Sequence, residues 1–236
     1  MRILETDMGE REMDKKNQQD RMGKPSGAFY RAEGHLTIQL LPQKGNEELL
    51  AEVPHILWLD LAVVFRYYWE EERYCCSMLI QWEYLADWNV TVEQVWRKAR
   101  ENMPRLFPVK LCSVEEAMRD MREGMEVKSQ KIRDRKRETG LSVQLYLLTN
   151  QRGYNGATAI FYEGVLKEFA ERVGKDLIIL PSSIHEVLLI PDDGTSSYEM
   201  LSALVREVNR SEVPRRDQLS DHIYRYLREK DCLEIA

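Results

Sequence analysis

Hydrophobic positions along the chain follow two spacings, and these predict which segments are strands and which are helices. In the second half, dense or alternating apolar runs predict strands over 142–149, 157–162, 176–180 and 184–190. Apolar residues at helical spacing predict a helix that begins at Val165 and stops at Gly174, and another over 197–209. The tail, 219–228, fits either an edge strand or a short helix.

The first half has a less regular pattern. Strands are predicted over 35–41, 57–68 and 74–81, although a buried helix fits 57–68 nearly as well. The run Thr-Val-Glu-Gln at 91–94 is a capping box, so a helix is predicted over 92–102, and Pro104 and Pro108 stop it.

The order of these elements points to an α+β architecture, with helices packed on one face of a largely antiparallel sheet. A parallel nucleotide-binding sheet needs strands that alternate with crossover helices, whereas this chain has hairpin-like strand pairs. The pattern also divides the chain into four parts: a disordered charged leader over 1–34, an N-terminal α+β half over 35–112, a charged helix or linker over 113–141, and a C-terminal α+β half over 142–236.

Composition and charge exclude several classes of protein and leave the predicted α+β architecture unchanged. The 236 residues are 43% hydrophobic and 31% charged, and the net charge of −6 disfavours general binding to nucleic acid or an anionic membrane. No apolar run is long enough to cross a bilayer, and the N-terminus lacks the apolar region of a signal peptide. Four cysteines without a metal-binding spacing fit a reduced compartment. We therefore expect a soluble cytoplasmic protein.

Several segments resemble a known family. They are 52–65, 102–108, the Leu-Thr-Asn and Asn-Gly-Ala runs within 146–194, the helix VLKEFAERVG, the run LPSSIHEVLLIPDDG and the closing LSDHIY. Together they resemble domain of unknown function family 5688, a bacterial family of anaerobic Gram-positive gut bacteria, over roughly residues 36–229. The resemblance implies a cytosolic α+β protein without an assigned activity. Because family members usually carry a longer N-terminal region, we expect this chain to lack part of it.

The run from Ser182 to Glu186 gathers residue types that nucleophilic catalysis uses. Ser182 and Ser183 supply hydroxyls, His185 an imidazole and Glu186 a carboxylate, and Asp221 could approach from the tail. A hydrolase that uses Ser183, His185 and Asp221 is therefore one hypothesis. However, no nucleophile-elbow motif or glycine-rich oxyanion loop accompanies these serines. A turn whose serine side chains satisfy backbone donors is the favoured interpretation.

Metal and cofactor sites are not expected. His185, Glu186, Asp192 and Asp193 are potential metal ligands, but neighbouring residues on a strand point to opposite faces, so the first two would not share an ion. The His-Glu pair does not continue into a His-Glu-x-x-His motif, and the chain contains neither a P-loop nor a dinucleotide-binding fingerprint.

Two further features suggest binding. The segment 128–137 is locally basic through Lys131, Arg133 and Arg135, but acidic neighbours and the lack of aromatic residues favour a solvated linker over a nucleic-acid contact. Asn155 is a candidate binding residue, and Gly156 is expected to take a positive φ in a tight turn between strands 142–149 and 157–162. The leading hypothesis is a non-enzymatic domain that binds an unknown protein or a small ligand.

Overall fold

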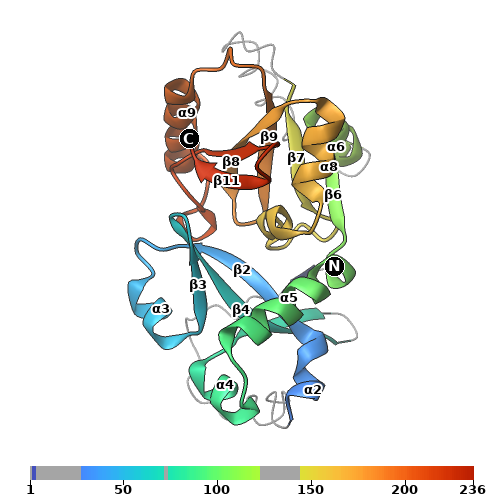
Figure 1. Ribbon diagram of the computed structural model, residues 1–236, viewed down its shortest axis with the longest axis vertical. Helices are drawn as coiled ribbons and strands as arrows, with labels where there is room; N and C mark the ends of the chain where they lie inside the picture. The colour runs from blue at the N-terminus through green and yellow to red at the C-terminus, as the bar shows by residue number, and fades with distance from the viewer. Residues whose placement is uncertain (1, 4–27, 72–73, 123–143) are drawn as a thin grey trace. The chain divides into compact units, whose positions relative to one another are not determined.

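The computed structural model describes residues 2–3, 28–71, 74–122 and 144–236. The chain forms two compact units, Met1–Leu106 and Phe107–Ala236, which are described separately (Figure 1). The division falls before residue 112 rather than after it, because the strand over Val109–Ser113 pairs with a strand of the second unit.

The long strand β4 (Leu61–Glu71) is the centre of the first unit's sheet. One edge of β4 pairs with β2 (Leu36–Pro42), and the other pairs with β3 (His55–Trp58) and then with β5 (Tyr74–Leu79), all antiparallel. The two-residue strand β1 (Arg2–Ile3) lies parallel to β5. This order places Leu61, Val63 and Phe65 on one face of the sheet and Ala62 and Val64 on the other, and all five are buried.

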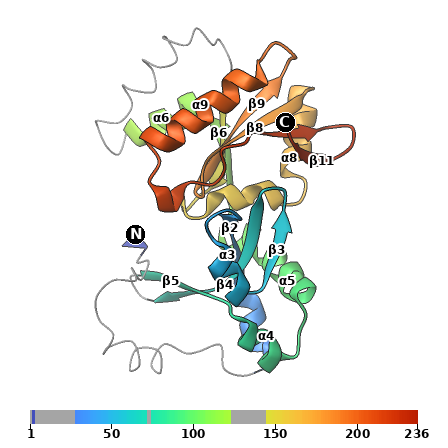
Figure 2. The same cartoon turned by 90° about the vertical axis from the view of Figure 1, so that its left-hand side faces the viewer.

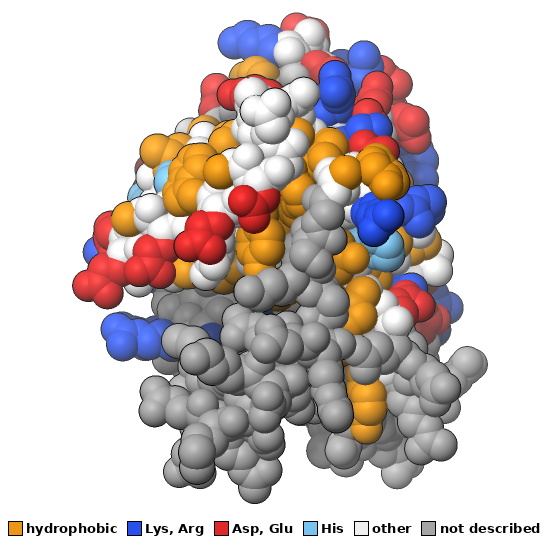
Figure 3. All heavy atoms as spheres, turned by 90° about the horizontal axis from the view of Figure 1, so that it is seen from below, with side chains coloured by type: hydrophobic (Ala, Val, Ile, Leu, Met, Phe, Trp, Pro, Cys, Tyr) orange, Lys and Arg blue, Asp and Glu red, His pale blue; other side chains and the backbone are white. Residues whose placement is uncertain are grey.

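Helices cover this sheet on both faces. The longest, α5 (Val92–Leu106), packs along β2, whereas α3 (Glu47–Glu52) packs Leu50 against Ala62 and Val64. The remaining elements are α2 (Phe29–Ala32), the 3₁₀ turn η1 (Glu33–His35) and α4 (Trp82–Trp88). On the face drawn in Figure 3, the described acidic and basic side chains lie around exposed hydrophobic ones.

The second unit is built on a six-stranded antiparallel sheet of order β11-β10-β8-β9-β7-β6. Its strands are β6 (Val109–Ser113), β7 (Tyr146–Asn150), β8 (Asp176–Ser183), β9 (Glu186–Asp192), β10 (Tyr224–Leu227) and β11 (Cys232–Ile235). The hairpin of β8 and β9 lies in the middle of the sheet. Because helices cover both faces, apolar residues fill successive positions of β8, from Leu177 to Leu180.

The helices of this unit are α6 (Val114–Arg122), the 3₁₀ helix η2 (Gly156–Phe161), α8 (Val165–Val173), α9 (Tyr198–Ser211) and η3 (Arg215–Asp217). Leu201 and Val205 of α9 pack against Ile178 and Ile190, while Phe169 of α8 contacts the ring of Tyr146. Figures 1 and 2 show α8 and α9 on opposite sides of the sheet. The predicted α+β class and antiparallel pairing are confirmed, with helices on both faces rather than one.

Two predictions for the second half are wrong. Residues 157–162 form η2 instead of a strand, because the backbone N–H groups of Ala157 and Thr158 bond to Ile184 and Asn155 rather than to a neighbouring strand. The predicted strand over 184–190 begins two residues later, because β8 continues through Pro181 to Ser183 after a register shift, and the reversal falls on Ile184 and His185. The predicted tail strand is present as β10, and Gly174 ends α8 in the left-handed conformation.

The first half also differs from its prediction in places. The run 57–68 is not one strand, because a turn at Leu59 and Asp60 divides it between β3 and β4. Residues 29–35 are helical rather than disordered, with Ala32 buried and the rings of Phe29 and Trp88 5.7 Å apart. The helix α5 passes through Pro104, which lies in its last turn. Most of the predicted leader and of the charged segment 113–141 lies outside the described residues.

Candidate functional site

Polar residues gather at both ends of the β8–β9 hairpin. The turn-end cluster contains Thr149, Asn155, Ser182, Ser183, His185, Glu186 and Asp217. The open-end cluster contains Asp176, Asp192, Tyr198 and Arg225. Because Asp176 pairs with Asp192 and Ser183 pairs with Glu186, the two clusters lie at opposite ends of the same pair of strands.

The serines of the turn-end cluster hold the turn itself. Ser183 Oγ accepts a hydrogen bond from the backbone N–H of His185 at 3.0 Å and donates one to Glu186 Oε1 at 3.0 Å. Ser182 Oγ donates to the same carboxylate oxygen at 3.3 Å. Both hydroxyls therefore serve as local turn contacts, as is usual for serine beside a reversal of the chain.

The imidazole of His185 is held from two sides. Its Nδ1 accepts the backbone N–H of Asn155 at 3.3 Å, so the neutral ring carries its proton on Nε2. Nε2 lies 3.9 Å from Asp217 Oδ1, which exceeds a direct hydrogen bond. The side chains of His185 and Asp217 are 30% and 20% exposed. The ring is thus fixed in orientation, and its Nδ1 lone pair is already used.

Gly156 allows its own backbone to lie close to Thr149 on β7 and to His185 in the β8–β9 turn. A Cβ atom at this position would collide with Thr149 Oγ1 and with the carbonyl oxygen of His185. These two atoms are joined by a 2.7 Å hydrogen bond, and the N–H of Ala157 donates to Ile184 at 3.2 Å. The positive φ expected at Gly156 occurs instead at Asn155, where φ is 49°. The glycine is needed for close approach rather than for its backbone conformation.

Asn155 carries the least satisfied polar group of the cluster. The residue is 3% exposed, and its Oδ1 has no hydrogen-bond partner among the residues that the structure describes. Its backbone is fully used, because the N–H bonds to His185 and the carbonyl accepts the hydroxyl of Thr158 at 2.6 Å. A buried acceptor without a partner costs about 1–3 kcal/mol. This combination of a left-handed backbone and an unpaired amide is typical of a functional position.

The structure places the other candidate residues elsewhere. Asp221 is exposed, and its Oδ1 accepts a hydrogen bond from Asn209 at 2.9 Å. The carboxylate beside His185 belongs to Asp217, which no sequence motif marks; its carbonyl accepts the N–H of Ile184. The basic residues Lys131, Arg133 and Arg135 lie outside the described residues. No group of three or more potential metal ligands occurs among the residues with described positions.

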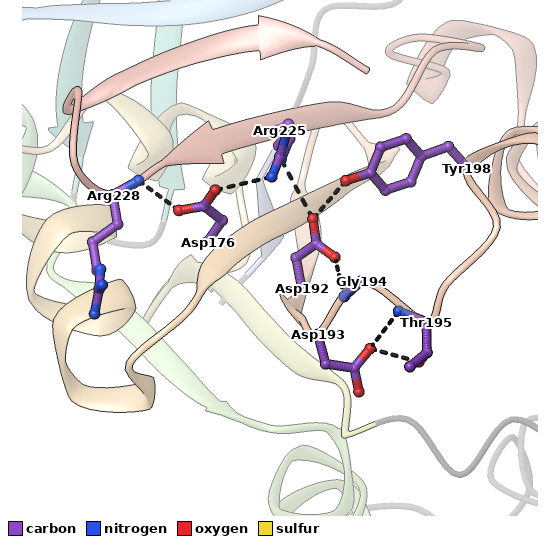
Figure 4. Close-up of polar contacts among 8 residues, drawn as sticks. All are labelled: Asp176, Asp192, Asp193, Gly194, Thr195, Tyr198, Arg225 and Arg228. Carbon is purple, nitrogen blue, oxygen red and sulfur yellow. Dashed lines mark hydrogen bonds and ion pairs between the residues drawn. The ribbon is translucent and has the colours of Figure 1, made fainter.

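The open-end cluster is held together by ion pairs and hydrogen bonds, although the buried Nε of Arg225 makes only an ion pair (Figure 4). Arg225 Nη2 donates to Asp176 Oδ2 at 3.0 Å, and Arg225 Nε lies 3.4 Å from Asp192 Oδ2 as an ion pair. Tyr198 donates to the same Asp192 oxygen at 2.5 Å, and backbone N–H groups of Gly194 and Arg228 fill the remaining carboxylate oxygens. Every carboxylate oxygen of Asp176 and Asp192 therefore has a donor.

The environment of this cluster changes the acidity of Tyr198. Burial, followed by the hydrogen bond to Asp192, raises the pKa of Tyr198 to about 12. The side chain of Asp192 is only 4% exposed, so its charge is balanced by Arg225 rather than by solvent. The cluster joins β8, β9, β10 and the start of α9, which makes it a structural connection.

Comparison with known proteins places the chain in a family. The sequence model of the Family of unknown function (DUF5688) matches residues 4–228. The chain belongs to this family. No curated protein and no solved structure matches it. In the part of the chain with described positions, no helix has the length and apolar character needed to span a membrane.

The segments that suggested DUF5688 in the sequence meet at one place in the fold. Thr149 comes from the Leu-Thr-Asn run, Asn155 and Gly156 from the Asn-Gly-Ala run, and His185 from the run LPSSIHEVLLIPDDG. Their contacts form the turn-end cluster. This makes the cluster the best candidate for a functional site in this DUF5688 protein.

Proposed function

We propose that this DUF5688 protein is a non-enzymatic binding domain and that its turn-end cluster holds a small polar ligand. The observation that carries the proposal is the buried Oδ1 of Asn155, which has no partner among the described residues and belongs to a residue whose backbone N–H contacts the partly exposed imidazole of His185. Buried polar groups in folded proteins nearly always have a partner, so an unpaired one suggests a partner supplied from outside the chain.

The same geometry favours binding over hydrolysis. The hydrolase hypothesis needs His185 as the base of Ser183, but the hydroxyls of Ser182 and Ser183 both donate to Glu186 instead. The His185 ring accepts a backbone N–H at Nδ1, and Asp221 bonds to Asn209 instead. No observation on the described residues favours the nucleic-acid hypothesis. We further propose a bacterial cytoplasmic protein, which the family resemblance and the free thiols of Cys112 and Cys232 support.

The imidazole provides a direct reporter of binding. The chain has four histidines, so selective ¹³C labelling of histidine gives four ring signals, and His185→Gln identifies the one from His185. The probes are methylammonium, acetamide, acetate and inorganic phosphate. We expect at least one to shift the His185 signal in a saturable manner, with roughly millimolar affinity because such small probes make few contacts.

Two controls make this test decisive. The signals of His35, His55 and His222 should not move, and Asn155→Gly, which keeps the left-handed backbone but removes the carboxamide, should abolish the shift. If no probe moves the His185 signal, the proposal fails.

The hydrolase alternative has its own measurement. A fluorophosphonate probe should not label the protein, and Ser183→Ala should leave the background signal unchanged. Labelling that disappears in both Ser183→Ala and His185→Gln would replace the binding function with a catalytic one.

A further inference from the structure

We propose that His185 is a pH-sensitive switch with two positions. The neutral ring is held on the backbone N–H of Asn155, and the protonated ring leaves that contact and pairs with the carboxylate of Asp217. The switch operates without a ligand, so it goes beyond the proposed function.

The contact between His185 and Asn155 requires a neutral ring. Nδ1 of the imidazole accepts the backbone N–H of Asn155 at 3.3 Å. A protonated imidazole carries a hydrogen on each nitrogen and has no acceptor left. Protonation of His185 therefore sets Nδ1–H against the N–H of Asn155, and two donors that face each other cannot form a hydrogen bond.

Two other histidines have the opposite arrangement. Nδ1 of His35 lies 3.0 Å from the carbonyl oxygen of Tyr68, and Nδ1 of His55 lies 2.9 Å from that of Val53. Because a carbonyl oxygen only accepts, Nδ1 is the donor in both rings, and a second proton at Nε2 leaves these bonds intact. Of these three rings, that of His185 is the one that loses its backbone contact when it becomes charged.

A partner for the charged ring lies on its other side. Nε2 of His185 is 3.9 Å from Asp217 Oδ1, and shortening this distance to about 2.8 Å would form a charge-assisted hydrogen bond. Arg216 Nε lies 3.7 Å from the same oxygen, but the Arg216 side chain is 74% exposed. Such an exposed ion pair is weak, so the charge of Asp217 stays available to the imidazole.

The groups around the ring leave the imidazole as the one that titrates near neutral pH. Asp217 and Arg216 lie on η3, Glu186 on β9 accepts both serine hydroxyls, and the ring centroid of Tyr154 is 6.2 Å from that of His185. Ordinary carboxyl groups are ionised above pH 5, ordinary phenols are neutral below pH 8, and guanidinium groups stay charged. An ordinary imidazole takes up its second proton between these two pH values.

The backbone of the turn does not depend on the ring. The carbonyl oxygen of His185 accepts the hydroxyl of Thr149 at 2.7 Å, and the N–H of Ile184 donates to the Asp217 carbonyl at 2.9 Å. Neither bond uses an imidazole nitrogen. We therefore expect protonation to move the ring and free the Asn155 amide while the hairpin keeps its place.

The experiment follows the histidine ring nitrogens and the Asn155 amide of the full ¹⁵N-labelled chain by NMR between pH 8 and pH 5. At pH 8, the His185 ring should be the Nε2–H tautomer, and the rings of His35 and His55 should be the Nδ1–H tautomer. As the pH falls, the Asn155 amide proton should move upfield with the same midpoint as the His185 ring, because the amide loses its acceptor. Asn155→Gly identifies the amide signal by its absence.

Three variants test the two positions. His185→Gln cannot take up the proton, so the Asn155 amide signal should stay constant from pH 8 to pH 5. Asp217→Asn keeps the backbone carbonyl that Ile184 needs but removes the charge, and it should lower the midpoint by about 0.5 pH units. Asp221→Asn is the matched control, because that exposed carboxylate bonds to Asn209, and the midpoint should not change.

The results that would overturn the switch are distinct from a failure of ligand binding. An Asn155 amide signal that does not follow the His185 ring, or that still moves in His185→Gln, removes the first position. An Nδ1–H tautomer of His185 at pH 8 has the same consequence. An unchanged midpoint in Asp217→Asn removes the second position. None of these measurements uses a ligand, so the outcome of the probe titrations leaves them unaffected.

Discussion

Polar groups are buried at both ends of the β8–β9 hairpin, but the partners that they find differ between the two ends. At the open end, every carboxylate oxygen of Asp176 and Asp192 has a donor, and Arg225 pairs its charge with both residues, although its buried Nε makes an ion pair with Asp192 and no hydrogen bond. At the turn end, backbone contacts are complete, but a buried amide oxygen of Asn155 has no partner among the described residues. The same two strands thus carry one cluster whose carboxylates are paired with a cation and one whose buried acceptor has neither a donor nor a charge partner among the described residues.

This difference separates a structural role from a binding role. A polar cluster whose buried charges are paired stabilises the elements it joins, because removing one member leaves another charge uncompensated. An unsatisfied group destabilises the fold and persists where it serves another purpose. The variants below test whether the two ends respond to substitution as this comparison requires.

The largest effect is expected for Gly156→Ala at the turn end. The added Cβ collides with Thr149 Oγ1 and the His185 carbonyl oxygen, and the latter is backbone that cannot move without opening the turn. We expect a loss of about 3 kcal/mol or more in the free energy of unfolding, measured by urea denaturation. Gly153→Ala is the control, because a Cβ atom at Gly153 would meet nothing within 4 Å and only the φ of 64° opposes the substitution. This variant should lose only about 1–2 kcal/mol in the free energy of unfolding. Equal costs for the two variants would contradict the close approach.

The next effect is expected for Arg225→Met at the open end. The substitution leaves the nearly buried charge of Asp192 without its cation, and we expect a loss of about 2–3 kcal/mol in the free energy of unfolding. Adding Asp192→Asn should restore part of this loss, because the uncompensated charge is then gone. If the double variant is less stable by the sum of the two single losses, the ion pair is not what joins these strands.

A smaller effect of opposite sign is expected for Asn155→Gly. It removes the unpaired Oδ1 and relieves a left-handed non-glycine backbone, so the free energy of unfolding should rise by about 1 kcal/mol. The matched control is Asn209→Ala, because Asn209 is equally buried but donates to Ser220 and Asp221, and its loss should cost about 1–3 kcal/mol. A stability loss in Asn155→Gly comparable to that control would show that the amide is structural.

The smallest effect concerns pH at the open end. The pKa of Tyr198 is raised from its ordinary value of 10 to about 12, so the fold favours the neutral phenol. This contribution is complete below pH 10 and is lost as the pH rises through 12. The melting temperature should therefore fall between pH 9 and pH 11 by about 1–3 °C more in the wild type than in Tyr198→Phe. Identical declines would remove Tyr198 from the alkaline transition.

Periodicity predicted the α+β class and the elements that pack one regular face. The helix from Val165 to Gly174 is an example, because both its apolar spacing and its stop signal are local. It failed over 157–162, where an apolar run forms a 3₁₀ helix because its backbone bonds to Ile184 and Asn155. It also misplaced the turn at Ser182 and Ser183, because β8 and β9 pair across Pro181 and Ser182 with a register shift that no local pattern encodes.

The sequence predicted several residues of the candidate site, but it did not predict which of them lie together. The sequence drew attention to Ser183, His185 and Asn155 because of their residue types and neighbours. It offered no reason to choose Asp217 over Asp221 as the carboxylate beside the imidazole. That choice depends on where the chain between α9 and β10 passes the hairpin turn, which the hydrogen bond from Ile184 to the Asp217 carbonyl fixes.

By itself, the sequence determined the α+β class, the antiparallel pairing and local elements such as the helix from Val165 to Gly174, because these follow from spacing and side-chain chemistry near in the chain. Only the tertiary structure decided that Gly156 is required for close approach, with the positive φ at Asn155 instead. It alone also left the buried Oδ1 of Asn155 without a partner among the described residues, and it brought Arg225 to the two aspartates at the other end of the hairpin. The physical reason is that hydrogen-bond satisfaction depends on segments far apart in the chain, and a one-residue shift in strand register changes which groups meet.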